Sequence, residues 1–226
     1  MTKYPKIQSI FKRDPENNYK TFLDGQYSEP EFAVLRNLEW EWTEKIDGTN
    51  VRVEVGKNFP NEDLCAIFKG RTDNAQMPTF LLTHLQTTFS PQGLGTAFAS
   101  EIPEGELPDI TLYGEGYGAK IQKRGGLYIP DGVGFILFDV RVGNIWLKYD
   151  AVRDIADKLG VPTVPRIGWG TLDAAVRYVR HDGFMSQVSA LEKPAEGLVL
   201  RAPCGLLTRM GKRIITKVKA KDFETE

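Results

Sequence analysis

Alternating hydrophobic and polar residues lie on both sides of the motif Glu44-Lys45-Ile46-Asp47-Gly48-Thr49-Asn50. Trp40 and Trp42 precede the motif, and the run Val51-Arg52-Val53-Glu54-Val55 follows it. A period of two is typical of a strand with one buried face, and Asp-Gly favours a tight turn. The pattern predicts a hairpin that holds Lys45 at the floor of a pocket, as a candidate nucleophile. The alternative is an ordinary hairpin with a surface lysine, because short motifs often match by chance.

Apolar runs predict further strands that end beside polar side chains. Residues 62–71 form a strand that delivers Arg71 to its end, and residues 110–118 place Glu115 between glycines, where a ligand can approach the backbone. The run 134–142 is almost wholly apolar, as in a strand buried on both faces, and contains Phe138. The simpler alternatives are a solvent-facing carboxylate at Glu115 and a core residue at Phe138.

The C-terminal part of the chain adds two strands with charged residues. Glu196 stands at the mouth of the apolar strand Leu198-Val199-Leu200. In residues 213–219 the alternation places Lys217 and Lys219 on one face. Two lysines on one strand face fit either a phosphate-binding site or a solvated edge that discourages aggregation.

Helical periodicity is confined to three segments, which we expect to serve packing. These are 77–89, with Pro78 suited to the first turn, 148–159, with Gly160 as a stop signal, and 173–180. Residues 161–165 contain two prolines and must be extended. The length of the chain suggests one large domain or two small ones.

The composition limits which binding partners and which metal ions the protein can have. The 226 residues are 41% hydrophobic and carry a net charge of −1, so a nucleic acid would need a local basic patch, such as residues 120–124 or 212–213. Two cysteines and two histidines are too few for a structural zinc site, which points to a hard, carboxylate-bound metal. The chain shows no signal-peptide core and no apolar run of about 18 residues, so we expect an intracellular protein without membrane contact.

The ordered set of motifs resembles the covalent nucleotidyltransferase superfamily of ATP-dependent ligases and mRNA capping enzymes. The order is Lys-x-Asp-Gly, an arginine after a strand, a glutamate between glycines, a Phe-Asp strand, a Glu-Gly strand and Lys-x-Lys. Within the superfamily the motif from Glu44 to Asn50 is most similar to the RNA ligases, particularly the RNA ligase 2 branch. DNA ligases usually have an arginine where Asn50 stands. The resemblance covers roughly residues 40 to 221. It implies an α+β fold with packed helices and with antiparallel sheets that flank a nucleotide cleft, as a single adenylation domain over residues 1–226.

The resemblance also implies roles for individual residues. Lys45 matches the lysine that forms the covalent bond to AMP, Glu196 matches a carboxylate that binds metal beside the reacting phosphate, and Lys217 and Lys219 match the pair that neutralises this phosphate. The resemblance implies ATP as the substrate and Mg²⁺, or Mn²⁺, as the metal ion. The other matching residues correspond to contacts with the nucleotide: Glu44 at the adenine, Asn50 near the phosphate, Arg71 at ribose or phosphate, Glu115 at the ribose hydroxyls and Phe138 stacked on the base.

In this reading the partners are RNA ends or a nicked duplex. The chain ends a few residues after Lys219, where many relatives continue into an OB-fold or a helical domain, so we expect no such domain here and allow for a partner protein that supplies it. Three rival functions remain: a capping-type guanylyltransferase, a DNA ligase, and a non-catalytic nucleotide- or RNA-binding module. Activation of a lysine nucleophile requires partial burial and nearby cations, because an ordinary lysine is protonated at neutral pH.

Overall fold

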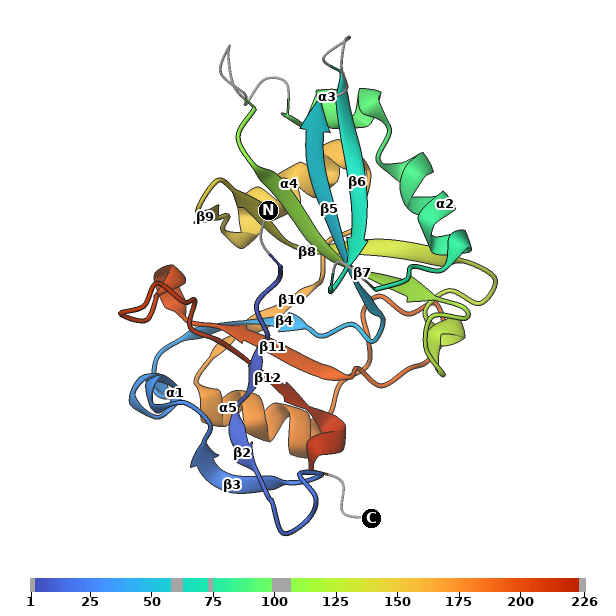
Figure 1. The fold of residues 1–226 in the computed structure, drawn as a ribbon. Coiled ribbons are helices and arrows are strands. Elements are labelled where there is room, and N and C mark those ends of the chain that lie inside the picture. The colour runs from blue at the N-terminus through green and yellow to red at the C-terminus, as the bar shows by residue number, and fades with distance from the viewer. Residues whose placement is uncertain (1–2, 58–62, 73–74, 99–106, 224–226) are drawn as a thin grey trace. The chain divides into compact units, whose positions relative to one another are not determined.

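The computed structural model describes residues 3–57, 63–72, 75–98 and 107–223, and it divides into two compact units. Unit 1 consists of residues 1–5 and 47–164, and unit 2 of residues 6–46 and 165–226. Both units contain a β-sheet with helices packed on it, as expected for an α+β protein (Figure 1). The prediction of a single domain over residues 1–226 stays a prediction.

Unit 1 is built on an antiparallel sheet with the strand order β6-β5-β7-β8-β9. Three helices pack with this sheet, and Val51, Val53 and Val55 of β5 point into their common core. The elements are β5 (Thr49–Lys57), β6 (Leu64–Gly70), α2 (Thr79–Thr88), α3 (Pro91–Phe98), β7 (Ile110–Gly118), η1 (Gly125–Leu127), β8 (Val133–Val142), β9 (Ile145–Trp146) and α4 (Tyr149–Leu159).

Unit 2 is built on a sheet with the strand order β1-β12-β11-β4-β10, in which only the pair β1–β12 is parallel among the described strands. Trp40, Trp42 and Leu198 share its core with helix α5. The elements are β1 (Gln8–Ser9), β2 (Phe11–Arg13), β3 (Phe22–Tyr27), α1 (Pro30–Leu35), β4 (Trp40–Glu44), β10 (Arg166–Gly170), α5 (Leu172–Arg177), η2 (Tyr178–Asp182), β11 (Gly197–Arg201), η3 (Pro203–Gly205), β12 (Ile215–Lys219) and η4 (Ala220–Asp222).

The predicted strands and helices are confirmed with shifts of a few residues at their ends. Gly160 ends α4 in the left-handed conformation, with φ of 68°, as a glycine stop should. The start of the strand predicted over 62–71 lies partly outside the described residues, and β6 begins at Leu64.

The predicted hairpin around Lys45 is wrong. β4 pairs with β10 and β11 in unit 2, whereas β5 pairs with β6 and β7 in unit 1. Both edges of each strand are therefore already occupied, and the two strands cannot pair with each other. The segment from Lys45 to Gly48 instead carries the chain from one sheet to the other.

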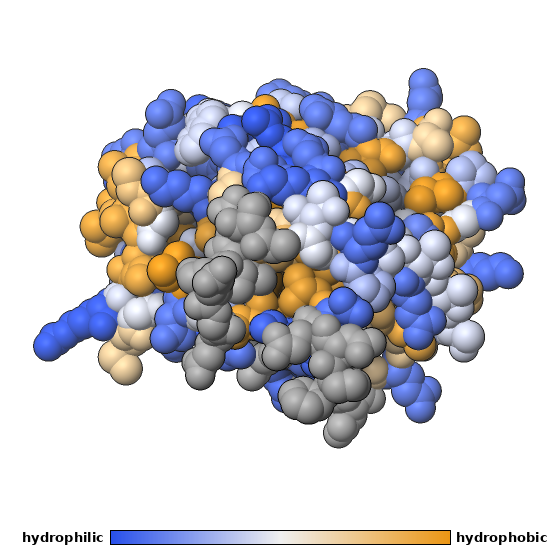
Figure 2. Space-filling model, turned by 90° about the horizontal axis from the view of Figure 1, so that it is seen from above, coloured by the Kyte–Doolittle hydropathy of each residue, from blue (hydrophilic) through white to orange (hydrophobic). Residues whose placement is uncertain are grey.

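The surface mixes polar residues with scattered apolar ones. Figure 2 shows hydrophilic residues with small hydrophobic patches among them on the face that it draws, which is ordinary for a globular protein. No helix within the described ranges is long and apolar enough to cross a membrane.

Candidate active site

Three charged side chains of unit 2 form a continuous chain of ion pairs. The Nζ atom of Lys45 lies 2.5 Å from Oε2 of Glu196, and the Nζ atom of Lys219 lies 2.6 Å from Oε1 of the same carboxylate. The side chains are 21%, 14% and 17% exposed for Lys45, Glu196 and Lys219, so they remain accessible to a ligand while being mostly desolvated. Lys45, Glu196 and Lys219 are three of the residues that the resemblance assigns to one site, and the structure brings them together.

The backbone of three adjacent strands brings these residues together. β11 lies between β4 and β12 in the sheet. The last residues of β4, the first residues of β11 and the last residues of β12 therefore lie side by side at one end of these strands. The N–H of Lys45 donates to the carbonyl of Gly197 over 2.9 Å, and the N–H of Ala220 donates to the carbonyl of Glu196 over 3.0 Å. The positions of the charged groups thus follow from the register of the sheet.

Two opposing effects act on Glu196. Burial by itself would raise the pKa of this carboxyl, but the ammonium groups of Lys45 and Lys219 outweigh burial and hold the pKa below its ordinary value. Glu196 is therefore ionised at neutral pH and is a poor proton acceptor. An ionised carboxylate of this kind is suited to binding a cation.

Lys217 shares a face of β12 with Lys219, as predicted. Thr216 and Val218 point to the opposite face and are fully buried. β12 pairs with β11 on one side and with β1 on the other, so it is not an exposed edge. The solvated-edge alternative does not describe this strand.

Glu44 has a different environment from the other predicted site residues. It pairs with Leu198, which places its side chain on the core face of the sheet, and it is 1% exposed. Its carboxylate accepts hydrogen bonds from the hydroxyl of Ser186 and, over 2.9 Å, from the N–H of Gln187. Burial raises the pKa of Glu44, and these two hydrogen bonds reduce that effect. Contact between Glu44 and a nucleotide would therefore have to come from its backbone.

Asn50 and Glu115 lie directly opposite each other on β5 and β7 in unit 1. The Oδ1 atom of Asn50 is buried and has no hydrogen-bond partner among the described residues, so it is available to a ligand or a water. Gly48 packs tightly beside this pair, because a Cβ atom there would lie 2.3 Å from the carbonyl oxygen of Gly116 and 2.7 Å from Cγ of Glu115. Glycine in the Lys-x-Asp-Gly motif is thus required for close packing against β7.

Arg71 and Phe138 belong to the same sheet of unit 1. Arg71 is exposed directly after β6, next to Gly70, which pairs with Val51. Phe138 is the extra residue of a β-bulge in β8, and its ring lies 5.0 Å from that of Tyr4 in an edge-to-face contact. The simple core interpretation of Phe138 therefore does not hold, because its side chain is only half-buried.

Sequence reasoning missed several residues that support the motif. Tyr128 accepts a hydrogen bond from the N–H of Asp47 at its hydroxyl over 3.1 Å, and Gln122 donates to the carbonyl of Gly48 over 2.9 Å. Ser186 and Gln187, which hold Glu44, lie in irregular structure. These residues sit far along the chain in segments without periodicity, so no sequence pattern pointed to them.

The sequence predicts a metal ion bound by carboxylates, so the positions of the acidic side chains test this prediction. Within the part of the chain that the structure describes, no three His, Cys, Asp or Glu side chains gather as a metal site. A single accessible carboxylate at Glu196 fits Mg²⁺ or Mn²⁺ bound through a substrate, because such ions often use one or two carboxylates and the phosphates of a nucleotide. It does not fit a cation held by the protein alone.

Comparisons with known proteins show which fold and family this chain is similar to. Structures of Naegleria gruberi RNA ligase match over nearly the whole chain: a mutant with ATP and Mn has a TM-score of 0.60 at 17% identity, covering 97% of this chain and 56% of that one. A mutant with AMP and Mn has a TM-score of 0.57 at 16% identity, and the form with PPi has a TM-score of 0.57 at 18% identity, each covering 99% of this chain and 59% of that one. At this identity the likeness establishes the fold.

The chain thus spans less than two thirds of the solved ligases that it matches. A comparison with curated proteins gives no match. The family model for RNA ligase, in contrast, matches residues 38–219, which include every predicted site residue from Glu44 to Lys219. The chain belongs to the RNA ligase family.

Proposed function

We propose that this protein is an ATP-dependent RNA ligase that joins 5′-phosphate and 3′-hydroxyl ends through a lysyl-AMP on Lys45. The observation that carries the proposal is the contact of Lys45 with Glu196, which also binds Lys219, in a chain of the RNA ligase family. A nucleophile, a carboxylate and a second cation within ion-pair distance are what transfer of a nucleotidyl group requires.

In the first step the amine of Lys45 attacks the α-phosphorus of ATP. An N–P bond forms, the bond from this phosphorus to the bridging oxygen breaks, and pyrophosphate leaves. Lys45 must lose a proton to solvent before it attacks, because an ammonium paired with Glu196 has no free electron pair. Lys217 and Lys219 stabilise the negative charge that grows on the phosphate oxygens.

Two further transfers use the same group. An oxygen of the RNA 5′-phosphate attacks the α-phosphorus of lysyl-AMP, which breaks the N–P bond, returns the amine to Lys45 and leaves AMP on the RNA. A 3′-hydroxyl then loses its proton to solvent as its oxygen attacks the 5′-phosphorus, the bond from this phosphorus to AMP breaks, and AMP leaves as the new phosphodiester bond forms.

A divalent cation bound by Glu196 and the nucleotide would supply Lewis-acid stabilisation of the phosphates. The solved ligase that matches this chain is described with ATP and Mn, which supports the choice of ATP and of Mg²⁺ or Mn²⁺. We propose that Asn50, Arg71, Glu115 and Phe138 bind the nucleotide, with Phe138 stacked on the base, and that Glu44 positions the backbone before Lys45.

Mass spectrometry of the protein after exposure to ATP and Mg²⁺ tests this function. We expect an added AMP on the peptide that contains Lys45, stable in alkali and labile in acid, and no such adduct on Lys45→Ala. The same assay with GTP separates the rival capping function, because a guanylyltransferase would carry GMP on Lys45. Label on Lys45→Ala would refute the assignment of the nucleophile.

A further inference from the structure

Unit 2 contains an open hollow of about 1070 Å³ between its N-terminal strands and β12. Seven cationic side chains and one carboxylate, that of Asp222, line the hollow. The whole chain has a net charge of −1, so this concentration of positive charge is local. The cationic residues are Lys6, Lys12, Arg13, Lys20, Lys217, Lys219 and Lys221.

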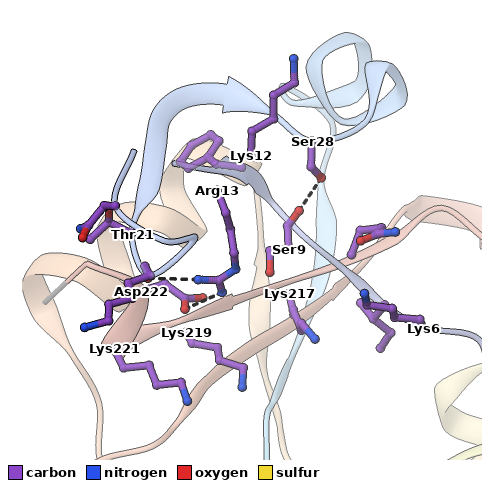
Figure 3. A pocket seen from close by; sticks show the side chains of 15 residues that line it. Lys6, Ser9, Lys12, Arg13, Thr21, Ser28, Lys217, Lys219, Lys221 and Asp222 are labelled. Carbon is purple, nitrogen blue, oxygen red and sulfur yellow. Dashed lines mark hydrogen bonds and ion pairs between the residues drawn. The ribbon is translucent and has the colours of Figure 1, made fainter. Parts of the chain in front are cut away.

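Not all of these charges face the hollow. The guanidinium of Arg13 is 2.7 Å from Asp222 and also donates to backbone carbonyls, so it stabilises the fold. The side chain of Lys12 runs away from β12 in Figure 3. Lys6 and Lys221, in contrast, have exposed side chains and no hydrogen bond or ion pair with another described residue.

Four ammonium groups follow one another along β12 in Figure 3, in the order Lys6, Lys217, Lys219 and Lys221. Lys217 and Lys219 are two residues apart on a strand, which separates their side chains by roughly 6.6 Å. Lys221 follows β12 in the short helix η4 and also lines the hollow. Lys6 precedes β1, which pairs with β12 at Ser9 and Lys217, and so extends the row at the other end.

We propose that this row of lysines binds the phosphate backbone of an RNA strand and leads it to Lys45. The proposal rests on the proposed ligase function and adds to it a path for the substrate. The spacing of Lys217 and Lys219 along β12 is comparable with that of neighbouring phosphates in an extended strand. Since Lys219 also binds Glu196, which contacts Lys45, the row leads directly into the candidate active site of unit 2.

The lining indicates contact with phosphates and not with bases. Phe11 is the only aromatic residue among the described residues that line the hollow, and it is 4% exposed, so it cannot stack on a base. Typical small-molecule pockets of about 300–1,000 Å³ are mostly apolar, unlike this lysine-rich hollow. Backbone contacts without stacking predict binding that is independent of sequence and strongly dependent on salt.

The triphosphate of ATP has the same chemistry as an RNA backbone and could use the inner lysines, Lys217 and Lys219. The outer lysines, Lys6 and Lys221, distinguish the two ligands, because a row of four exceeds what one triphosphate needs. The test therefore removes the outer pair alone.

Fluorescence anisotropy of a labelled single-stranded RNA with a 5′-phosphate, measured without ATP over a series of KCl concentrations, provides the test. For Lys6→Gln/Lys221→Gln we expect weaker binding and a slope of log affinity against log salt that is flatter by about 1.4, since each lost contact to a single strand removes about 0.7. The control Arg36→Gln/Arg177→Gln removes two exposed charges of unit 2 that do not line the hollow, and it should keep the wild-type slope.

An unchanged slope in the Lys6/Lys221 variant, or an equal change in the control, would overturn the proposal. A raised KM for ATP with an unchanged RNA slope would also overturn it and assign the row to the nucleotide. RNA binding is measured without ATP and does not require lysyl-AMP. Failure of the protein to form lysyl-AMP would therefore refute the ligase function without changing the measured contribution of the lysine row to RNA binding.

Discussion

The ammonium group of Lys45 lies 2.5 Å from the carboxylate of Glu196, so the proposed nucleophile is paired with the proposed metal ligand. While this pair persists, Nζ of Lys45 is engaged with Glu196 and not with a nucleotide. If Glu196 held a divalent cation, its carboxylate would be less available to Lys45. Adenylation should therefore depend on Glu196 at the first step as well as at the last.

Glu196→Ala should lower the rates of both lysyl-AMP formation and joining of adenylated RNA, each by about 10²-fold or more, the scale for one lost group that stabilises a transition state. Single-turnover rates with labelled ATP and with adenylated RNA measure the two steps. Glu192→Ala is the matched control, because Glu192 is an exposed carboxylate four residues earlier. Loss of only one of the two steps would contradict a role of Glu196 in every transfer.

Lys217→Ala and Lys219→Ala should each reduce the rate of adenylation by about 10²-fold, because each removes a positive charge from the site of pyrophosphate release. Rapid quenching after mixing with α-labelled ATP gives this rate. Lys12→Ala, which changes an exposed lysine of the same unit, should adenylate normally. Normal rates in the two β12 variants would leave their lysines without a part in catalysis.

Glu196 and Glu44 should affect stability with opposite dependence on pH. The folded pKa of Glu196 lies below the ordinary 4.5, so its ion pairs stabilise the protein above that value and are lost as pH falls through the folded pKa. The folded pKa of Glu44 lies above 4.5, so its contribution decreases as pH rises through the folded pKa.

Chemical denaturation of the wild type, Glu196→Gln and Glu44→Gln over acid to neutral pH measures both effects. The free energy of unfolding of the wild type minus that of Glu196→Gln should increase with pH. The corresponding difference for Glu44→Gln should decrease with pH. Two differences of the same sign would contradict the environments described for these carboxyls.

Gly48→Ala should destabilise unit 1 by about 1–3 kcal/mol, the usual cost of forcing an extra methyl group into a packed site. The added Cβ would displace Glu115 or the backbone at Gly116, so binding of ATP should weaken as well. Thermal unfolding and ATP titration measure the two effects. Gly126→Ala is the control, because a Cβ atom there meets nothing within 4 Å.

The local patterns predicted most of the elements and the face on which Lys217 and Lys219 lie, because alternation and helical spacing are properties of the segment itself. The partners of a strand, in contrast, are not a property of its own segment. The Asp-Gly turn indicated a hairpin, yet β4 and β5 entered different sheets, since β10, β11, β6 and β7 from distant segments occupied their edges.

The same limit applies to the candidate site. The resemblance assigned Lys45, Glu196 and Lys219 to one site, but only the structure shows that Glu196 bridges the two lysines and that Glu44 points to the core. The row that extends to Lys6 depends on the parallel pairing of β1 with β12, which joins residues more than 200 positions apart. No pattern along the chain indicates such a pairing.

Joining of RNA that already carries AMP on its 5′-phosphate tests the ligase function most directly, because it isolates the final transfer from the chemistry of Lys45. With Mg²⁺ and no ATP, the wild type should join such RNA to a 3′-hydroxyl end. Lys45→Ala should retain some of this activity while failing to join ordinary 5′-phosphate ends. Joining by the wild type at no more than the uncatalysed rate, with both RNA and DNA acceptors tried, would contradict the ligase function of this chain.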